Sequence, residues 1–226
     1  MGPNVAVIIA HPDDAESWAG GTVAKLVREG KVVTYVVVTN GEKGSSDRTM
    51  TPERLAGIRQ AEQRRAAGVL GVQHVEFLGY RDCEVEDTWG LHHDIARQIQ
   101  RLQPELLITH EPRRTFNLGV SHRDHRIVGG VVLDNAVSDC VDPPPTVREI
   151  YLMHPADPPN LIVDISETVE IKAAAFACHL SQVESAQRAM ASIRERAAHL
   201  GQGYGLAYAE GFTRVIAGRP VPSTSN

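Results

Sequence analysis

The sequence predicts a single α/β domain with a Rossmann-like, mostly parallel sheet flanked by helices. Short runs of β-branched residues alternate along the chain with longer helical stretches, which is the order that strand–helix–strand crossovers produce. The runs are apolar almost throughout, and this fits strands that are buried on both faces. With 226 residues, of which 42% are hydrophobic, the chain is long enough to bury one full core. We expect this domain to span residues 1–219 and residues 220–226 to form a disordered tail.

The order of the elements follows from these runs. Strands are expected at Val5–Ala10, Val32–Thr39, His74–Leu78, Leu106–Thr109, Glu149–Met153 and Leu161–Asp164. Helices are expected at Ala15–Glu29, Pro52–Leu70, Gly90–Leu102, Arg123–Asn135, Glu167–His179 and Val183–His199. Polar stretches rich in Gly, Ser or Pro predict loops at Asn40–Thr51, Glu111–Ser121 and Ser138–Thr146. The pair Gly20-Gly21 indicates close packing of the first helix against a strand.

The composition excludes several classes of function. The formal net charge is -5 and no run of Lys and Arg reaches five residues, so neither nucleic acid nor an anionic membrane is expected as a partner. The 3 cysteines are far apart and include no CxxC pair, which excludes a disulfide framework and a thiolate zinc site and suits a reducing compartment.

The run Val5–Ala10 is too short for a signal peptide and no stretch has the length of a membrane span, so we expect a cytoplasmic protein. The loop Gly41–Asp47 lacks the Gly-Lys-Ser/Thr ending of a P-loop, which argues against nucleotide hydrolysis. The sequence leaves open whether the chain forms a homo-oligomer.

Polar clusters follow several of the expected strands. They are His11–Glu16, Asn40–Lys43, Gly79–Asp82 and His110–His125. Open α/β sheets place their sites at the carboxyl ends of the strands, so we expect these clusters to meet at one edge of the sheet.

The first cluster carries two types of metal ligand. His11 and Asp14 are three residues apart, so in a first helical turn their side chains would share one face. Pro12 suits such a turn because the N–H that it lacks has no partner there. Imidazole and carboxylate are both ordinary zinc ligands. The alternative for this segment alone is a helix start whose acidic residues complement the helix dipole.

The second cluster places two histidines and an aspartate within four residues, at His122, Asp124 and His125. One histidine would complete a catalytic metal site with three protein ligands and a free position for water. The other would pair with Asp124, which would orient the ring and favour its charged form. The alternative for this segment alone is a solvated helix start of mixed charge. Two such clusters at two strand ends together favour a metal site.

These two motifs together resemble the LmbE/PIG-L family of zinc-dependent N-acetylglucosaminyl deacetylases. The resemblance covers most of the chain, with further matches at Thr39–Glu42, Arg59, Glu62, Gly79–Asp82, Lys172 and His179–Gln182. The chain departs from the family pattern at Arg123, where the family usually has proline. It also has Val120 where some members carry a tyrosine that assists the oxyanion.

The resemblance implies a role for each site residue. His11, Asp14 and His125 would hold the metal, and Asp13 would be the general base. A protonated His122, with Asp124 behind it, would lie across the scissile carbonyl and stabilise the oxyanion. The family positions that contact the substrate match Arg59 and Asp82. The resemblance implies Zn²⁺, although this ligand set also suits Fe²⁺, and it implies no organic cofactor.

The expected function is therefore hydrolysis of an N-acetyl or other acyl group from a small amino-sugar conjugate. A second hypothesis is an amidase of the same chemistry that acts on a mycothiol S-conjugate or an antibiotic precursor. A third, from another class, is a catalytically silent sugar- or nucleotide-binding module, because fold alone does not fix function. That hypothesis predicts a damaged metal set, whereas His11, Asp13, Asp14 and His125 are all present.

The remaining histidines carry weaker signals. His110 and His154 each follow a strand, and the sequence leaves open whether they support the site or have no role in it. The others are expected to be surface or structural residues, namely His74, His92, His93, His179 and His199. Without the family resemblance, Arg59 would be an ordinary helix arginine paired with Glu62.

Overall fold

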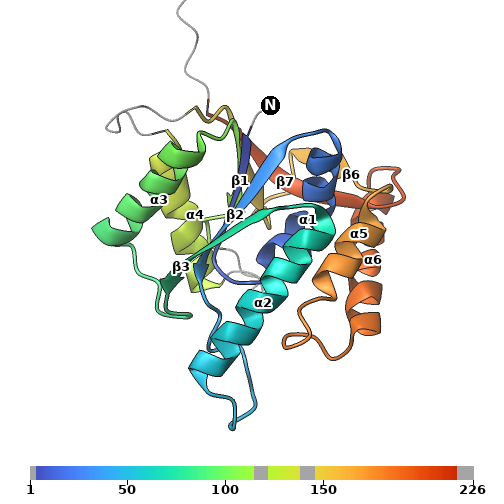
Figure 1. Ribbon diagram of the computed structural model, residues 1–226. Helices are drawn as coiled ribbons and strands as arrows, with labels where there is room; N and C mark the ends of the chain where they lie inside the picture. Colours follow the sequence, from blue (N-terminus) through green and yellow to red (C-terminus); the bar gives the residue numbers. More distant parts are fainter. Residues whose placement is uncertain (1–3, 115–121, 138–145, 218–226) are drawn as a thin grey trace, which may run out of the picture.

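A computed structural model describes residues 4–114, 122–137 and 146–217 (Figure 1). The strands are β1 (Asn4–Ile9), β2 (Val32–Thr39), β3 (His74–Tyr80), β4 (Leu106–His110), β5 (Glu149–Met153), β6 (Leu161–Asp164) and β7 (Ala209–Ile216). The helices are α1 (Asp14–Arg28), α2 (Pro52–Leu70), α3 (Trp89–Leu102), α4 (Arg123–Ala136), α5 (Val169–Phe176) and α6 (Ala186–Gln202). The expected tail at residues 220–226, the segment 115–121 and most of the loop Ser138–Thr146 lie outside the described residues.

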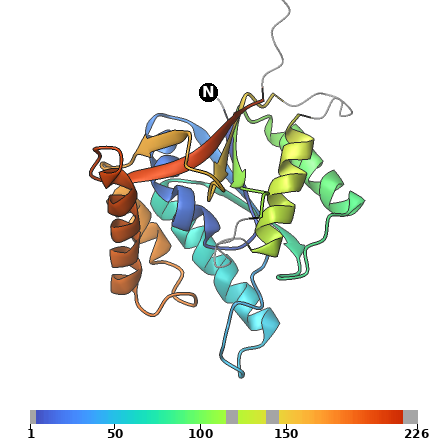
Figure 2. The ribbon, with the colours of Figure 1, turned by 180° about the vertical axis from the view of Figure 1, so that it is seen from behind.

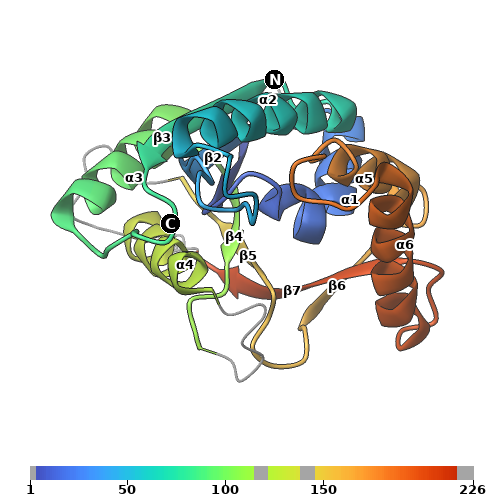
Figure 3. The ribbon, with the colours of Figure 1, turned by 90° about the horizontal axis from the view of Figure 1, so that it is seen from below.

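One sheet contains all of these strands, in the order β3-β2-β1-β4-β5-β7-β6. Strands β1 to β5 are parallel, and β1 pairs with β2 on one side and with β4 on the other. The chain order therefore reverses between β1 and β4, which is the switch point where open α/β sheets bind ligands. Figure 3 looks along the sheet from below and shows α1 and α4 on either side of this point.

Two hydrophobic clusters cover the two faces of the sheet. Alternate residues of β1 enter opposite clusters, with Val7 on the side of α1, α2 and α5 and Ile8 on the side of α3 and α4. This follows from the two-residue period of a strand. Figures 1 and 2 show the same division into two helical layers from opposite sides. The expected α/β fold with a mostly parallel sheet is confirmed.

The main difference from the expected elements is β7, which the sequence did not predict. It runs antiparallel to both neighbours and lies between β5 and β6. The helices α5 and α6 also start later than expected: the Ser185 side chain caps the start of α6, whereas the Thr168 side chain makes no capping bond at the start of α5. Thr168 Oγ1 donates to the carbonyl of Gly21, and Ser185 Oγ accepts from the N–H of Arg188.

The paired glycines of α1 do allow close packing, but against a different neighbour from the strand that we expected. A Cβ added to Gly21 would lie 2.8 Å from the side chain of Ile165, and one added to Gly20 would lie 3.0 Å from Lys172 of α5. The helix α1 therefore approaches α5 and the turn before it closely. Among the described residues, no helix has both the length and the apolar character needed to cross a membrane.

Candidate active site

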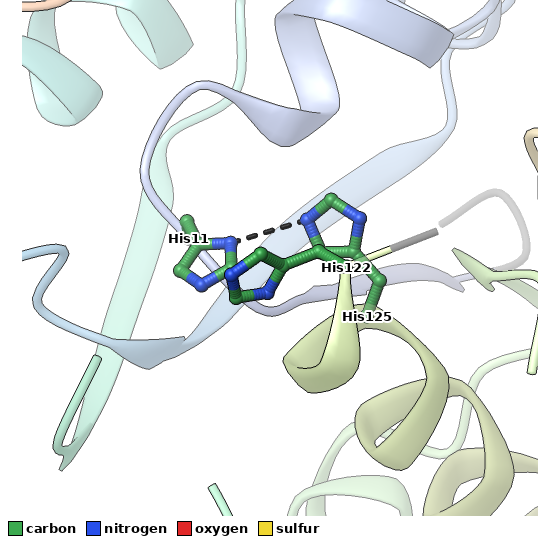
Figure 4. A group of neighbouring side chains, drawn as sticks. All are labelled: His11, His122 and His125. Atoms are coloured by element: carbon green, nitrogen blue, oxygen red, sulfur yellow. Dashed lines mark hydrogen bonds between the residues drawn. The ribbon is translucent and has the colours of Figure 1, made fainter. Parts of the chain in front are cut away.

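The predicted polar clusters meet at the switch point of the sheet. His11 follows β1 after one residue, His110 ends the neighbouring strand β4, and His122 and His125 lie at the start of α4. The rings of His11 and His122 have centroids 4.9 Å apart, and those of His11 and His125 are 5.1 Å apart (Figure 4). Segments separated by more than 100 residues thus place three imidazoles together.

The three predicted metal ligands form a compact triangle of ligand atoms. His11 Nδ1 lies 3.1 Å from His125 Nε2, as the dashed line in Figure 4 marks. Asp14 completes the triangle, with Oδ1 at 3.1 Å from His125 Nε2 and Oδ2 at 3.4 Å from His11 Nδ1. A tetrahedral zinc ion with ligands at about 2.0–2.1 Å places those ligands about 3.3–3.4 Å from one another. The triangle therefore has the dimensions of a metal site.

Two carboxylates orient the ring of His11. Its Nε2 lies 3.2 Å from Asp82 Oδ1 and 3.3 Å from Asp124 Oδ2, and both aspartates are buried. The N–H of Cys83 donates to the same Asp124 oxygen at 2.7 Å. A proton held at Nε2 leaves the Nδ1 lone pair pointing at Asp14 and His125. Metal-ligating histidines have this second contact to a carboxylate as a rule, because it fixes the tautomer.

His110 supports the other side of the triangle. Its ring stacks on His125 with a centroid distance of 4.1 Å, and its Nε2 lies 3.3 Å from Asp14 Oδ2. The atoms of Asp14, His110 and His125 are also close enough to share a metal. However, His110 Nε2 accepts from the N–H of Ala10 at 3.0 Å, which occupies the lone pair that a metal would need. His110 therefore fits a supporting position better than a ligand position.

Asp14 is poised as a charged ligand. Its Oδ2 accepts from the N–H of His11 at 2.7 Å. Burial opposes the ionisation of Asp14, but the rings of His125 and His110 hold its pKa well below its usual range. The carboxylate is therefore available in its charged form, which is the form that binds metal.

Asp13 does not lie in the first helical turn, as the sequence had suggested. It precedes α1 with φ at 102°, a conformation that costs non-glycine residues about 1–3 kcal/mol and that concentrates at functional sites. Its N–H donates to Gln63 Oε1 at 2.9 Å. His11 and Asp14 still meet, because the chain turns before the helix begins. The turn also brings the Asp13 carboxylate into contact with Arg59, so Asp13 is not one of the three residues of the triangle.

The contacts of Arg59 fix the position of Asp13. The buried guanidinium donates to Asp13 Oδ2 at 3.1 Å, to the carbonyl of Pro12 at 2.6 Å and to the carbonyl of Gly41 at 2.9 Å. It does not pair with Glu62, which instead accepts from Ser181. Burial raises the pKa of Asp13 to about 6, against the opposing effect of the Arg59 guanidinium. These contacts support Asp13, and the substrate contact expected of Arg59 stays a prediction.

His122 has a different partner from the one expected. Its Nδ1 accepts from the backbone N–H of Asp124 at 3.2 Å, so the ring caps the start of α4. The Asp124 carboxylate binds His11 and the N–H of Cys83, and within the described residues it makes no hydrogen bond to the His122 ring. A ring that accepts at Nδ1 is neutral and carries its proton at Nε2. Burial and the nearby rings of His11 and His125 also lower the pKa of His122, so a protonated His122 is not supported.

Several residues that support the site were not predicted from the sequence. Cys83 contributes a backbone N–H to Asp124 and has a positive φ of 63°. Gln63 lies four residues after Arg59 on α2 and binds both the N–H of Asp13 and Glu16 Oε1. Glu16 also contacts His179, which is thereby explained as a structural residue. The polar pair at positions 59 and 63 on one helix face was the signal available in the sequence.

Comparison with known proteins gives this arrangement a family. The family model described as "PIG-L: GlcNAc-PI de-N-acetylase" matches residues 6–136. The diacetylchitobiose deacetylase of Thermococcus kodakarensis is 31% identical over 192 residues, which cover 79% of this chain and 69% of that protein. A 1D-myo-inositol 2-acetamido-2-deoxy-α-D-glucopyranoside deacetylase of a Mycobacterium species is 25% identical over 232 residues, covering 81% of this chain and 75% of that protein.

A solved structure extends the likeness to the whole fold. The N,N′-diacetylchitobiose deacetylase from Pyrococcus horikoshii, in complex with its inhibitor, superposes with a TM-score of 0.85 at 28% identity. The match covers 98% of this chain and 88% of that chain. The family resemblance seen in the sequence motifs is therefore confirmed, and this chain belongs to the PIG-L (LmbE) family of hydrolytic N-deacetylases.

Proposed function

We propose that this chain is a zinc-dependent hydrolase that removes an N-acetyl group from an amino-sugar conjugate. The observation that carries the proposal is the triangle of His11 Nδ1, Asp14 and His125 Nε2, with contacts of 3.1–3.4 Å beside a separate carboxylate. The names of the relatives supply the substrate class, because they act on a chitobiose and on an inositol conjugate of an N-acetylated amino sugar.

The donor set fits a catalytic metal. Two imidazoles and one carboxylate leave a tetrahedral ion with one free position, which is the pattern of catalytic zinc sites. Several buried atoms around the triangle have no hydrogen-bond partner within the described part of the chain, including Asp124 Oδ1 and His125 Nδ1. When bound, zinc lowers the pKa of a coordinated water to about 7 and polarises the carbonyl of the amide. Ferrous iron suits the same donors, so metal content has to be measured.

Asp13 is proposed as the general base. Its carboxylate lies beside the triangle and does not contribute to it, so it is free to take a proton from the attacking water. The same oxygen then passes that proton to the departing nitrogen, which leaves as an amine. Arg59 and Gln63 hold Asp13 from two sides, at the carboxylate and at the backbone N–H. A base that is held in this way is already oriented for proton transfer when the substrate binds.

His122 is proposed to stabilise the oxygen of the scissile carbonyl. In its neutral form it presents Nε2–H on the side of the ring away from the α4 backbone, because Nδ1 is engaged there. A positioned donor of this kind typically contributes about 3–4 kcal/mol to the transition state as negative charge develops on the oxygen. Asp82 and Asp124 act through His11, whose tautomer they fix.

The test is an amine-release assay on a panel of N-acetylglucosamine conjugates, with the metal content of the same sample measured by atomic emission. We expect activity on at least one conjugate, its loss on chelation and its recovery on addition of zinc. Full activity in metal-stripped protein would overturn the metal mechanism. Including antibiotic-type amides and a mycothiol S-conjugate in the panel tests the alternative amidase. No turnover of any amide, with metal bound, would favour the silent binding module.

A further inference from the structure

A cavity lies between α1, α6 and the start of β7, next to the proposed active site. Its volume is about 200 Å³. We call it the Arg196 cavity, after one of its lining residues. Its walls include Trp18, His154, Lys172, Arg196 and Glu210. None of these residues has a role in the reaction proposed above.

The Arg196 cavity adjoins the metal-ligand triangle along α1. Trp18 follows Asp14 by four residues, so the two side chains lie on the same face of the helix. On the sheet, His110 pairs with Met153, and His154 comes next in the chain. The cavity thus lies one helical turn along α1 from Asp14 and one residue along the chain from the strand partner of His110. A substrate that extends from the triangle in this direction would enter it.

Arg196 provides a cation without a carboxylate partner. Its guanidinium stacks over the ring of Trp18 at 4.7 Å, and its two terminal nitrogens each lie 3.4 Å from Ser17 Oγ. Its Nε is buried with no partner, and no carboxylate pairs with the guanidinium within the described segments. Each terminal nitrogen carries two N–H groups, so one on each is left for a ligand beyond the long contacts to Ser17.

The other charges that line the cavity cancel each other. Lys172 Nζ contacts Glu210 Oε1 at 2.6 Å, and both side chains are buried. Glu210 also accepts from the N–H groups of Gly21 and Thr22 at 2.9 and 2.7 Å. Glu210 is thus neutralised and fully hydrogen-bonded, which leaves the positive charge of Arg196 uncompensated.

His154 supplies a further polar group under strain. Its φ is 56°, which is uncommon for a residue other than glycine, and its buried Nε2 has no partner among the described residues. Strained backbone persists where the surrounding structure fixes it and is concentrated at ligand sites. The cavity therefore combines a cation without a carboxylate partner and an imidazole nitrogen without a hydrogen-bond partner among the described residues, and the Trp18 ring contacts both side chains.

We propose that the Arg196 cavity is a substrate subsite that binds an anionic group, either a carboxylate or a phosphate, on the aglycone of the amino-sugar conjugate. Arg196 binds the anion through the N–H groups of its terminal nitrogens, a geometry that matches both groups, while the Trp18 ring holds the guanidinium in position. This inference rests on the proposed deacetylase function and adds the charge class of its substrate.

The first test uses the unaltered protein with bound zinc. Amine release is measured on matched N-acetylglucosamine conjugates whose aglycones are neutral, carboxylate-bearing or phosphate-bearing but otherwise of similar size. We expect kcat/KM to be about 10- to 100-fold higher for at least one anionic conjugate, the effect typical of a hydrogen bond to a charged group. The arm with the higher value identifies the anion as carboxylate or phosphate. Equal values for all three conjugates would overturn the subsite and leave the deacetylase function intact, whereas no turnover of any of them would count against that function.

The second test assigns the effect to Arg196. The variant Arg196→Gln should raise KM for the anionic conjugate about 10- to 100-fold, with kcat kept and the neutral conjugate unaffected. Arg196→Lys, which keeps the charge but not the fork, should retain part of the preference. Arg194→Gln is the matched control, because Arg194 lies on the same helix and pairs with Glu170 outside the cavity. An Arg196→Gln variant that keeps the full preference for the anion would refute the assignment, and the wild-type panel decides the proposal if that variant does not fold.

Discussion

Replacing each of the two neighbouring aspartates with asparagine separates proton transfer from metal binding. Asparagine keeps the size of aspartate and one carbonyl oxygen, but it carries no charge and is not a base near neutral pH. Asp13 directs its carboxylate at Arg59, whereas Asp14 directs both oxygens at His11 and His125. The same substitution therefore removes a different property at each position.

The expected size of each effect follows from the contacts that the substitution keeps or removes. In Asp13→Asn the amide oxygen still accepts from Arg59 and the backbone N–H still donates to Gln63, so the geometry and the metal are kept. Loss of the base should lower kcat by roughly 10²–10⁴, or about 2.7–5.4 kcal/mol in activation free energy. In Asp14→Asn the triangle loses its only charge. Removal of a residue that only hydrogen-bonds to a metal ligand typically lowers metal affinity about 10- to 100-fold. Because Asp14 is itself a proposed ligand, Asp14→Asn should lower zinc affinity by more than that.

The assay measures zinc per chain, zinc affinity by chelator competition and turnover on the same purified variants. Asp134→Asn, at an exposed position on α4, is the control for the substitution itself. Activity of Asp14→Asn should recover in part at high zinc, and that of Asp13→Asn should not. If Asp13→Asn loses its zinc while Asp14→Asn keeps it, the two roles are reversed. If both variants bind zinc and turn over normally, the site lies elsewhere.

Four further substitutions test the residues that support the triangle and the packing of α4 beside it. Asp124→Asn should lower zinc affinity about 10- to 100-fold in the competition assay, since it weakens the hold on His11; unchanged affinity would contradict this role. Arg59→Lys should lower kcat about 10- to 100-fold with little change in KM, because it displaces the base, whereas a rise in KM alone would instead support a substrate contact. Gly129→Ala should destabilise the fold by about 1–3 kcal/mol, because its Cβ would overlap the carbonyl at the end of β4. Gly130→Ala, which meets only one atom at 4.0 Å, should stabilise the helix by up to about 1 kcal/mol. Thermal unfolding of both alanine variants measures these stabilities. A Gly129→Ala variant that is more stable than Gly130→Ala would contradict the prediction.

Most of the fold was predictable because the parallel strands are short, apolar and bounded by polar loops. The exception, β7, carries Glu210 and Gly211 within the strand, and its pattern resembles neither a buried nor a half-exposed strand. Glu210 is tolerated there only because Lys172 and the backbone of α1 satisfy its oxygens. A compensation that comes from two segments distant in the chain, α5 and α1, cannot be inferred from local sequence.

The site was predictable as a set of residues but not as a set of contacts. The spacing of His11 and Asp14 and the second motif at His122–His125 indicated which side chains meet. The spacing could not show that Asp13 has a positive φ, since a helical first turn was the simpler expectation. It also could not show that the Asp124 carboxylate binds His11 and leaves His122 to cap α4, because His11 is distant from Asp124 in the chain and local spacing favours a contact with His122.

The segment around the start of α1 is held by two separate groups of residues, one for the metal ligands and one for Asp13. The second group explains why α2 has a buried polar face. The metal ligands are held from β4 and α4, through His110 and Asp124. Asp13 is held from α2, where Arg59 and Gln63 lie one helical turn apart and are both buried. Burying an arginine and a glutamine on one helix face is unfavourable unless each finds partners. Apart from the carbonyl of Gly41, the partners found here belong to residues 12–16, the segment that carries the proposed base. The polar face of α2 is therefore better explained by the position of the base than by packing of the core.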